Sequence, residues 1–311
     1  MKQGRVIPWF YLAPAIVVMT FFIVYPMVNT IYLSFLNSKG NAPAYTDCLT
    51  GQPCWGIFEN YRHALTGELD LRNPVAAWNS FWTSSYGNNI KWIVLMVSGT
   101  VILGLLIAVL ADRVKYESIA KSIIFTPMAI SFVGAGIIWG FVYRYNSGNQ
   151  QTGLLDAIIV GLGGKPISIL TIPQVNTMAL IVVGIWIWTG FAMTILAAAL
   201  KGVPDEILEA SRVDGANEFQ VFFSIMLPMI APTVTVVITT MVINTLKLFD
   251  IVYVMTGGNY GTDVIANRMY RDMYTDFQTG HGTAVAVVLV IAILPFVYLN
   301  IKRFLEQEAS R

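Results

Sequence analysis

Three polar side chains stand close together near the end of a long apolar run. They are Asn244, Lys247 and Asp250, and Tyr253 follows them. Ionisable groups inside a membrane span are rare and mark substrate or ion pathways, so these four residues are candidates for a substrate cavity. A continuous helix would put Asn244 and Lys247 on one face and let Lys247 pair with Asp250. The alternative is that Lys247 extends to a membrane interface and forms that pair there.

A second group of candidates lies in the apolar run that ends at Leu200, and consists of Trp186, Thr189 and Phe191. Sugars present C–H faces that stack on aromatic rings and hydroxyls that need polar partners, so such residues suit a sugar site. Trp186 is about 21 Å from Leu200 along a helix, which is past the middle of a span. Tryptophan also marks membrane interfaces, so a structural role is the alternative.

Motifs for catalysis and nucleotide binding are absent from the sequence. It contains no GxxxxGK[ST] loop, HExxH, GxSxG or Cys/His cluster, so we expect no catalytic site and no metal or cofactor in this chain. His63 and His281 stand apart in polar segments and are interpreted as surface residues. Cys48 and Cys54 lie in one polar loop, and the sequence leaves open whether they form a disulfide or stay as two free thiols.

The composition is that of a membrane protein. Of 311 residues, 56% are hydrophobic and only 12% are charged, against about 25% charged in soluble domains. The mean hydropathy is +0.63. A net charge of +1, without a run of Lys or Arg, gives no support for binding to nucleic acid.

Six apolar runs are long enough to cross a bilayer, which predicts an all-α membrane protein with six transmembrane helices. The predicted spans cover residues 6–36, 92–111, 122–143, 177–200, 229–255 and 282–301. Pro127 lies inside the third span, where neighbouring helices can satisfy the backbone group that it frees. The first run is too long for a signal-peptide core, so we expect an uncleaved span.

The distribution of Lys and Arg orients these spans. Ten of these residues lie in the two termini and in the loops at residues 112–121 and 201–228, about 55 residues together. The opposite loops carry eight in about 110 residues. The positive-inside rule therefore predicts that both termini and the 201–228 loop are cytoplasmic.

The longest polar interruption in the C-terminal half runs from Glu209 to Pro228. Pro204 and the two acidic residues after it favour the start of a helix. Gly215 can then bend or break that helix without a Cβ to obstruct a close backbone. A second amphipathic segment, residues 217–226, is expected to end at Leu227–Pro228. We interpret the stretch as a helical hairpin that docks a soluble partner.

This stretch resembles the EAA loop in permease subunits of bacterial binding-protein-dependent ABC importers. The family pattern is Glu-Ala-Ala, three residues, Gly, nine residues and Ile-x-Leu-Pro, and serine replaces the second alanine here. The matching positions are Glu209, Ala210, Ser211, Gly215, Ile225, Leu227 and Pro228. Residues 247–258 also resemble a span end of maltose- and glycerol-phosphate-type permeases, and residues 58–61 resemble an outer-loop segment of sugar permeases.

The resemblance implies the type I ABC importer permease fold in a bacterial inner (plasma) membrane. Residues 1–86 would form the first span and an outer loop, residues 87–303 the transmembrane domain, and residues 304–311 a cytoplasmic tail. The implied partners are a second homologous permease, two ATP-binding subunits that hold ATP and Mg²⁺, and an extracytoplasmic solute-binding protein. The helix at 209–215 would occupy a cleft of one ATPase. Candidate contacts at its edge are Glu209, Arg212, Asp214 and Glu218.

Within that family the sequence is similar to the carbohydrate branch of maltose, α-glucoside and glucosylglycerol type. This implies a sugar or glycoside osmolyte, such as glucosylglycerol, trehalose or sucrose. The spans hold almost no arginine, which weighs against a phosphorylated substrate of the glycerol-phosphate type. An ion-coupled secondary transporter that acts alone would need an intramembrane carboxylate, for which Asp250 is the candidate. Neither a secondary transporter nor a membrane scaffold without a substrate would explain the 209–228 pattern.

Overall fold

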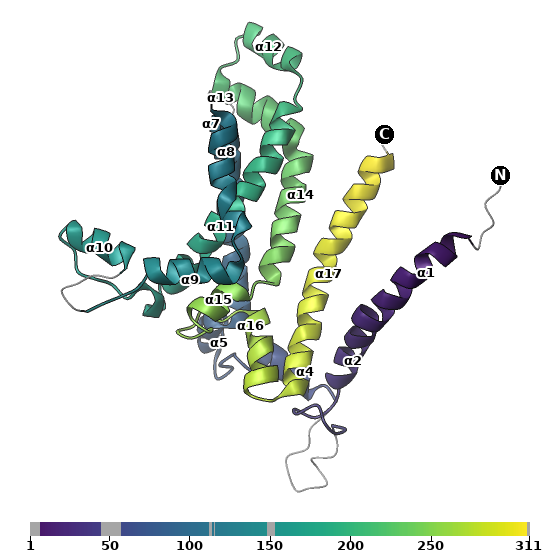
Figure 1. The fold of residues 1–311 in the computed structure, drawn as a ribbon. Helices are drawn as coiled ribbons and strands as arrows, with labels where there is room; N and C mark the ends of the chain where they lie inside the picture. The colour runs from purple at the N-terminus through teal and green to yellow at the C-terminus, as the bar shows by residue number, and fades with distance from the viewer. Residues whose placement is uncertain (1–6, 45–56, 112–113, 115, 148–152, 310–311) are drawn as a thin grey trace. The chain divides into compact units, whose positions relative to one another are not determined.

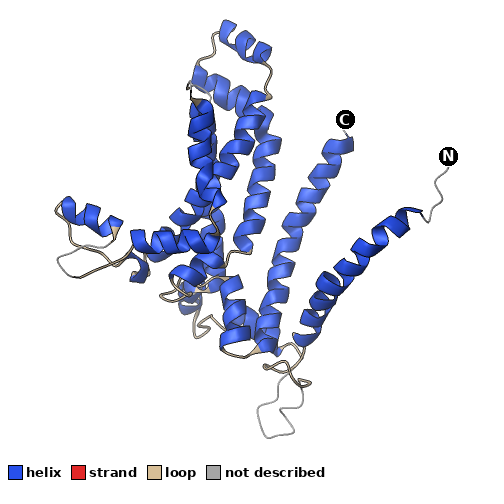
Figure 2. Cartoon of the chain, viewed as in Figure 1, coloured by secondary structure: helices blue, strands red, loops and turns tan. Residues whose placement is uncertain are grey.

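The computed structural model describes residues 7–44, 57–111, 114, 116–147 and 153–309. Over these residues the chain is built from helices and their connections, and strand pairing is limited to one isolated bridge between Leu36 and Pro43 (Figure 2). Five helical stretches are long and apolar enough to cross a membrane, and a sixth is counted if a bent helix pair is taken as one span. The predicted all-α membrane fold is confirmed.

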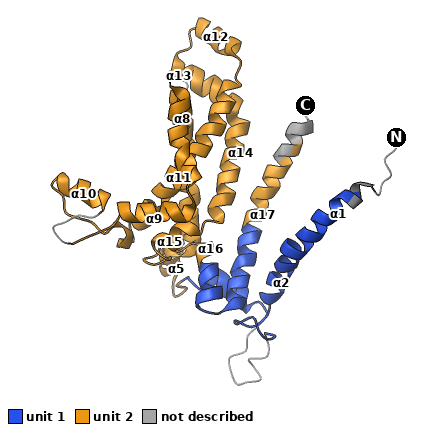
Figure 3. Cartoon of the chain, viewed as in Figure 1, with its two compact units in different colours: residues 1–69, 268–292 blue, residues 70–267, 293–311 orange. Residues whose placement is uncertain are grey.

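The chain divides into two compact units, residues 1–69 with 268–292 and residues 70–267 with 293–311 (Figure 3). The helices of the first unit are α1 (Ile7–Met19), η1 (Thr20–Val24), α2 (Tyr25–Leu33), α4 (Glu59–Thr66), the second half of α16 (Ile265–Tyr270) with η6 (Arg271–Thr275), and the start of α17 (Thr279–Ala309). The turn η1 is a π-helical widening that joins α1 and α2 into one apolar stretch, as predicted for the first span.

The second unit holds the remaining helices (Figure 1). Its first half contains α5 (Pro74–Thr83), α6 (Ser85–Lys91), η2 (Trp92–Val97), α7 (Ser98–Ala111), α8 (Glu117–Phe125), η3 (Thr126–Ala129), α9 (Phe132–Val142), α10 (Leu154–Gly161) and η4 (Ile169–Thr171). Its second half contains α11 (Asn176–Lys201), α12 (Asp205–Val213), α13 (Glu218–Val221), η5 (Phe222–Met226), α14 (Leu227–Leu246) and α15 (Asp250–Met255).

The centre of the second unit is α11, the most buried of the candidate spans. It packs along α7, and the two backbones approach closely because the contact is lined by small residues. A Cβ placed on Gly104 of α7 would lie 2.7 Å from the Cβ of Ala192 and 2.9 Å from the Met193 nitrogen. The predicted span at 177–200 therefore coincides with the helix on which the unit is assembled.

The third predicted span is not one continuous helix. The α8 segment ends in the 3₁₀ turn η3, which contains Pro127, and α9 then leaves at 99°. Proline restricts its neighbour and lacks an N–H, which favours a helix end here. Ser131 caps the new helix by accepting a hydrogen bond from the Gly134 nitrogen at 3.0 Å. The prediction of a helix running unbroken through Pro127 is wrong.

The fifth predicted span is also interrupted. Helix α14 ends at Leu246, Lys247 leaves it with φ −91° and ψ 7°, and α15 begins only at Asp250. At its other end α14 begins without a break, because α13, η5 and α14 form one apolar helical stretch from Glu218 to Leu246. The expected end at Leu227–Pro228 is therefore wrong.

The π-helical turn η5 explains how the helix passes Pro228. The Leu227 nitrogen donates to the Phe222 carbonyl, five residues back, which widens the turn just before the proline. Such widened turns accommodate the hydrogen bond that a proline cannot make.

Candidate functional site

The hairpin at one end of the second unit is built from α12, a short turn and α13 (Figure 1). Pro204 precedes α12, and Asp205 and Glu206 occupy its first turn, where negative charge favours the helix dipole. Gly215 ends it with φ +88°, a conformation that favours glycine. The predicted start and bend of this helix are confirmed.

Backbone hydrogen bonds close the turn at both sides. The Gly215 nitrogen donates to the Arg212 carbonyl at 3.1 Å, and the Ala216 nitrogen donates to the Ser211 carbonyl at 3.0 Å. This pair of bonds is the Schellman arrangement of a helix C-terminus. Asn217 and Gln220 then form a capping box at the start of α13. The hairpin is thus formed by local interactions.

The residues of the 209–228 pattern separate into two groups. Glu209, Ala210, Asp214 and Gly215 are exposed, as is Pro228, whereas Ile225 and Leu227 are half-buried. Ser211 is buried, and its hydroxyl donates to the Leu208 carbonyl at 2.7 Å. Glu209, Ala210, Asp214 and Gly215 thus form an exposed surface on α12 and the turn after it, and the half-buried side chains lie at the base of the hairpin.

Exposed apolar side chains flank this surface, and sequence reasoning did not single them out. Val213, on the last turn of α12, is 87% exposed, and Phe219, on α13, is 72% exposed. Ile207 and Phe223 are about half exposed, at 42% and 48%. An apolar patch rimmed by charged residues is typical of a protein–protein contact. The sequence signal that could have found this patch is a hydrophobic side chain at the end of an otherwise polar helix.

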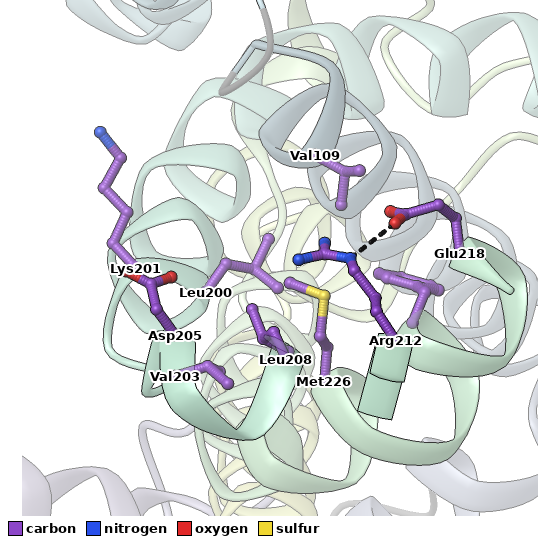
Figure 4. A pocket seen from close by; sticks show the side chains of 10 residues that line it. Val109, Leu200, Lys201, Val203, Asp205, Leu208, Arg212, Glu218 and Met226 are labelled. Atoms are coloured by element: carbon purple, nitrogen blue, oxygen red, sulfur yellow. Dashed lines mark hydrogen bonds and ion pairs between the residues drawn. The ribbon is translucent and has the colours of Figure 1, made fainter. Parts of the chain in front are cut away.

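A pocket of about 610 Å³ lies beneath α12 (Figure 4). Its walls combine six apolar side chains with four charged ones, Lys201, Asp205, Arg212 and Glu218. The Arg212 Nε lies 2.9 Å from the Glu218 Oε1, and the pair reaches across the turn between α12 and α13. Arg212 and Glu218 were predicted as contacts to a partner, and in this structure they bind each other.

A second ion-pair group secures the helices beside the hairpin. Glu117, at the start of α8, pairs with Lys121 on its own helix and with Lys201 at the end of α11, whose Nζ lies 2.7 Å from Glu117 Oε1. The Glu117–Lys201 pair ties the start of α8 to the end of α11, two helices that also pack against each other.

The aromatic candidates on α11 pack against α9. Trp186 contacts Trp139 edge to face, with ring centroids 5.7 Å apart. Phe191 contacts Trp188 in the same way at 5.6 Å. Thr189 is buried, and its hydroxyl donates to the Ile185 carbonyl of its own helix at 2.6 Å. These residues form an aromatic cluster, and their predicted contact with substrate stays a prediction.

The polar candidates near the end of α14 do not form the predicted helix face. Of these four candidates, Asn244 alone lies inside α14, and its amide donates to the Thr240 carbonyl at 3.0 Å. Lys247 and Asp250 lie on opposite sides of the break, and no ion pair joins these two described residues. Tyr253 stacks on Phe249, with ring centroids 4.9 Å apart. The shared face and the Lys247–Asp250 pair are corrected accordingly.

A polar loop, residues 256–264, follows α15 and is held by side chains from distant helices. Asn88 is fully buried, and its amide donates to the carbonyls of Gly261 at 2.7 Å and Asp263 at 2.9 Å. Asn176 donates to the Tyr260 carbonyl at 2.8 Å. Asn89 accepts from the Ile265 nitrogen at 2.8 Å. Asn88 and Asn89 therefore anchor the loop.

In the first unit the two histidines are partners, which corrects their interpretation as separate surface residues. The rings of His63 and His281 stack with centroids 3.8 Å apart. Beside them the buried Arg268 donates to the carbonyls of His63 at 3.0 Å and Ala64 at 2.9 Å. A guanidinium at the carbonyl end of α4 stabilises that helix end. Cys48 and Cys54 lie outside the described residues.

Among the described residues no group of His, Cys, Asp and Glu is arranged to hold a metal ion. Exposed polar and apolar side chains lie together instead on the hairpin and around its pocket. Together with the apolar helices, they define a membrane protein whose second unit carries an exposed helical hairpin.

Comparison with known families identifies this class. The chain belongs to the family of binding-protein-dependent transport system inner membrane components, whose family model matches residues 100–311. It is therefore an integral inner-membrane protein, the permease subunit of an ABC importer.

Curated relatives match nearly the whole chain. The osmoprotective compounds uptake permease protein GgtC of Synechocystis sp. is 45% identical over 97% of this chain and 100% of its own length. The α-glucoside transport system permease protein AglF of Rhizobium meliloti is 43% identical over 95% of this chain and 81% of its own length. The chain thus lies in the carbohydrate branch that the sequence pattern indicated.

Solved structures show the same fold. A chain of a bacterial alginate ABC transporter, in complex with an alginate pentasaccharide-bound periplasmic protein, superposes with a TM-score of 0.73 at 20% identity. The match covers 94% of this chain and 92% of the other. The type I importer permease fold expected from the sequence is confirmed.

Proposed function

We propose that the chain is one of two permease subunits of an ATP-driven importer for a glycoside osmolyte or related α-glucoside. ATP and Mg²⁺ would bind in two separate ATPase subunits, and an extracytoplasmic solute-binding protein would deliver the substrate. The observation that carries this proposal is the projecting hairpin, on which Glu209, Ala210 and Gly215 are exposed beside the apolar Val213 and Phe219.

The direction of transport follows from the orientation of the hairpin. The charge distribution along the chain predicts that residues 201–228 and both termini face the cytoplasm. The hairpin then meets cytosolic ATPases, and the 256–264 loop, at the far end of α14, faces the solute-binding protein. ATP-driven closure of the ATPases would move α12 and the spans joined to it, which changes access to a central site.

The substrate class is supported by the relatives and by the aromatic cluster. Two similar proteins are named for osmoprotective compounds and for α-glucosides. Trp186 and Phe191 lie on the central helix α11, where a sugar ring could stack. Thr189, Asn244, Lys247, Asp250 and Tyr253 remain candidates for polar contact with the sugar.

An ion-coupled transporter that acts alone is not favoured. Its coupling carboxylate would be Asp250, and this residue begins α15, outside the apolar helical stretches that could cross the membrane. A transporter of that class would also have no use for the exposed surface of α12.

The test is a bulky charged substitution at the bend, Gly215→Arg. A Cβ at Gly215 meets nothing within 4 Å, so the arginine would extend into the space that a docked partner occupies. We expect ATP-dependent uptake by the reconstituted importer to fall by about tenfold or more, the scale of a change at the centre of an interface. The measurement is radiolabelled glycoside uptake into proteoliposomes, with ATP hydrolysis followed in parallel.

The matched control is Gly163→Arg. Gly163 has φ +86° and also has no neighbour within 4 Å of an added Cβ, so the backbone strain is equal. It lies next to α10, away from the hairpin. Loss of uptake with Gly215→Arg and retention with Gly163→Arg support docking. Wild-type uptake that proceeds without any ATPase, or equal activity of the two variants, would refute the proposal.

A further inference from the structure

The docking helix α12 is joined to the rest of the second unit by two short connections. On one side a short segment joins it to α11, and on the other the turn at residues 214–217 joins it to α13. The pocket of about 610 Å³ lies between α12 and residues of α7, α11 and η5. Close packing therefore does not support the whole inner face of α12.

The Arg212–Glu218 ion pair spans the second of these connections, the turn at residues 214–217. Arg212 is on the last turn of α12 and Glu218 is the first residue of α13, with Gly215 between them. The Nε–Oε1 distance is 2.9 Å, and the guanidinium extends over the pocket toward the carboxylate (Figure 4). The pair thus joins the two arms of the hairpin beyond the backbone bonds of the turn.

The contribution of this pair to folding is small. Its side chains are 47% and 56% exposed, and exposed ion pairs add little to stability because solvent screens them. Its geometric effect is larger, since α13, η5 and α14 form one continuous helical stretch. An angle fixed between α12 and α13 is therefore fixed between the docking surface and α14.

We infer that Arg212 and Glu218 are positioning residues that lock the docking helix to α14, so that movement of a bound ATPase reaches the membrane spans. The inference rests on the proposed function and adds a regulatory element to it. Without the pair, α12 would still bind the ATPase, but part of the ATPase movement would be absorbed by rotation at Gly215. The number of substrate molecules transported per ATP hydrolysed would then fall.

The experiment is a charge-swap series in the reconstituted importer. The variants are Arg212→Glu, Glu218→Arg and the double variant with both changes, and Arg212→Lys serves as the conservative control. We measure glycoside uptake and ATP hydrolysis in the same proteoliposomes, and the amount of ATPase that copurifies with the permease.

Each single reversal places like charges across the turn, and we expect it to lower uptake per ATP by about fivefold. ATPase copurification should stay at the wild-type amount. The double variant should recover uptake per ATP to within about twofold to threefold of wild type. Recovery should be incomplete because a glutamate at 212 also faces Asp205 and Glu209 on α12. Arg212→Lys keeps the charge and should lie near wild type.

Three results would overturn the inference. Single reversals without effect on uptake per ATP would show that the pair does not couple the helices. A double variant as impaired as the single variants, with reduced ATPase copurification, would show that Arg212 and Glu218 contact the ATPase directly and would leave the proposed function intact. Wild-type uptake that does not require the ATPase would instead refute the proposed function itself.

Discussion

The two ends of the second unit are stabilised in opposite ways. At one end the hairpin around α12 is exposed, and its hydrogen bonds join residues only a few positions apart. At the other end the 256–264 loop, which is exposed at its tip and buried at Thr262 and Asp263, is bound by Asn88 and Asn176, which lie far away in the sequence. The first end presents a surface to a partner, and the second end ties helices together.

This difference has a consequence for mobility. A segment with local bonds and much exposed surface can shift as a body when a partner binds, since few contacts with the rest of the unit must break. The loop cannot shift without losing buried hydrogen bonds from two helices. It also contains Tyr260 at φ +58°, a strained conformation that the surrounding bonds maintain. We therefore expect movement at the hairpin and rigidity at the loop.

The largest expected effect comes from glycine substitutions that compare the two ends. Gly258→Ala should destabilise the protein by about 3 kcal/mol. Its φ is +82°, and the new Cβ would lie 2.7 Å from Asp263 Oδ1 and against Asn267, two buried side chains that bind each other. The measurement is the thermal unfolding midpoint in detergent, followed by tryptophan fluorescence.

Two matched controls share the backbone strain without the clash. Gly261 in the same loop and Gly215 in the hairpin have φ of +75° and +88°, with nothing within 4 Å of an added Cβ. Alanine at either position should cost only about 1 kcal/mol. A midpoint for Gly258→Ala as high as that of Gly215→Ala would contradict the rigid-loop description.

A smaller effect is expected from Asn88→Leu, which keeps a side chain branched at the same atom but removes three hydrogen bonds, two that the amide donates and one that it accepts from the Lys91 Nζ. The carbonyls of Gly261 and Asp263 would lose a buried donor, and the free energy of unfolding should fall by about 2 kcal/mol. The control is Asn244→Leu, since the Asn244 amide donates only within its own helix. Equal midpoints for the two variants would show that Asn88 does not anchor the loop.

The same contrast explains which features could be predicted from the sequence. Pro204, the acidic first turn and Gly215 act on neighbouring residues, so the start and bend of α12 were predictable. The continuation of the helix through Pro228 was not, because it depends on the widened turn at η5. The family pattern located the hairpin, but its Arg212–Glu218 pair became visible only in the structure.

The candidate cavity was harder to predict because long-range contacts shape it. No glycine or proline marks the break after Leu246, and an unbroken helix was the natural expectation there. In the structure the Thr245 carbonyl near that break accepts from the Asn89 amide at 3.4 Å, a contact that spans much of the chain. The packing of α15 against α9 then takes Asp250 away from Asn244. Periodicity within one segment cannot show such contacts.

The most direct test of docking is site-specific photocrosslinking from α12 in membranes that contain the whole importer. A photoreactive amino acid replaces Val213, which is 87% exposed, and in a second strain replaces Leu162, which is 84% exposed at the end of α10. We predict a crosslink from position 213 to the ATPase subunit, changing in yield with ATP, and none from position 162. Absence of an ATPase crosslink from position 213, or equal yields from both positions, would contradict the account.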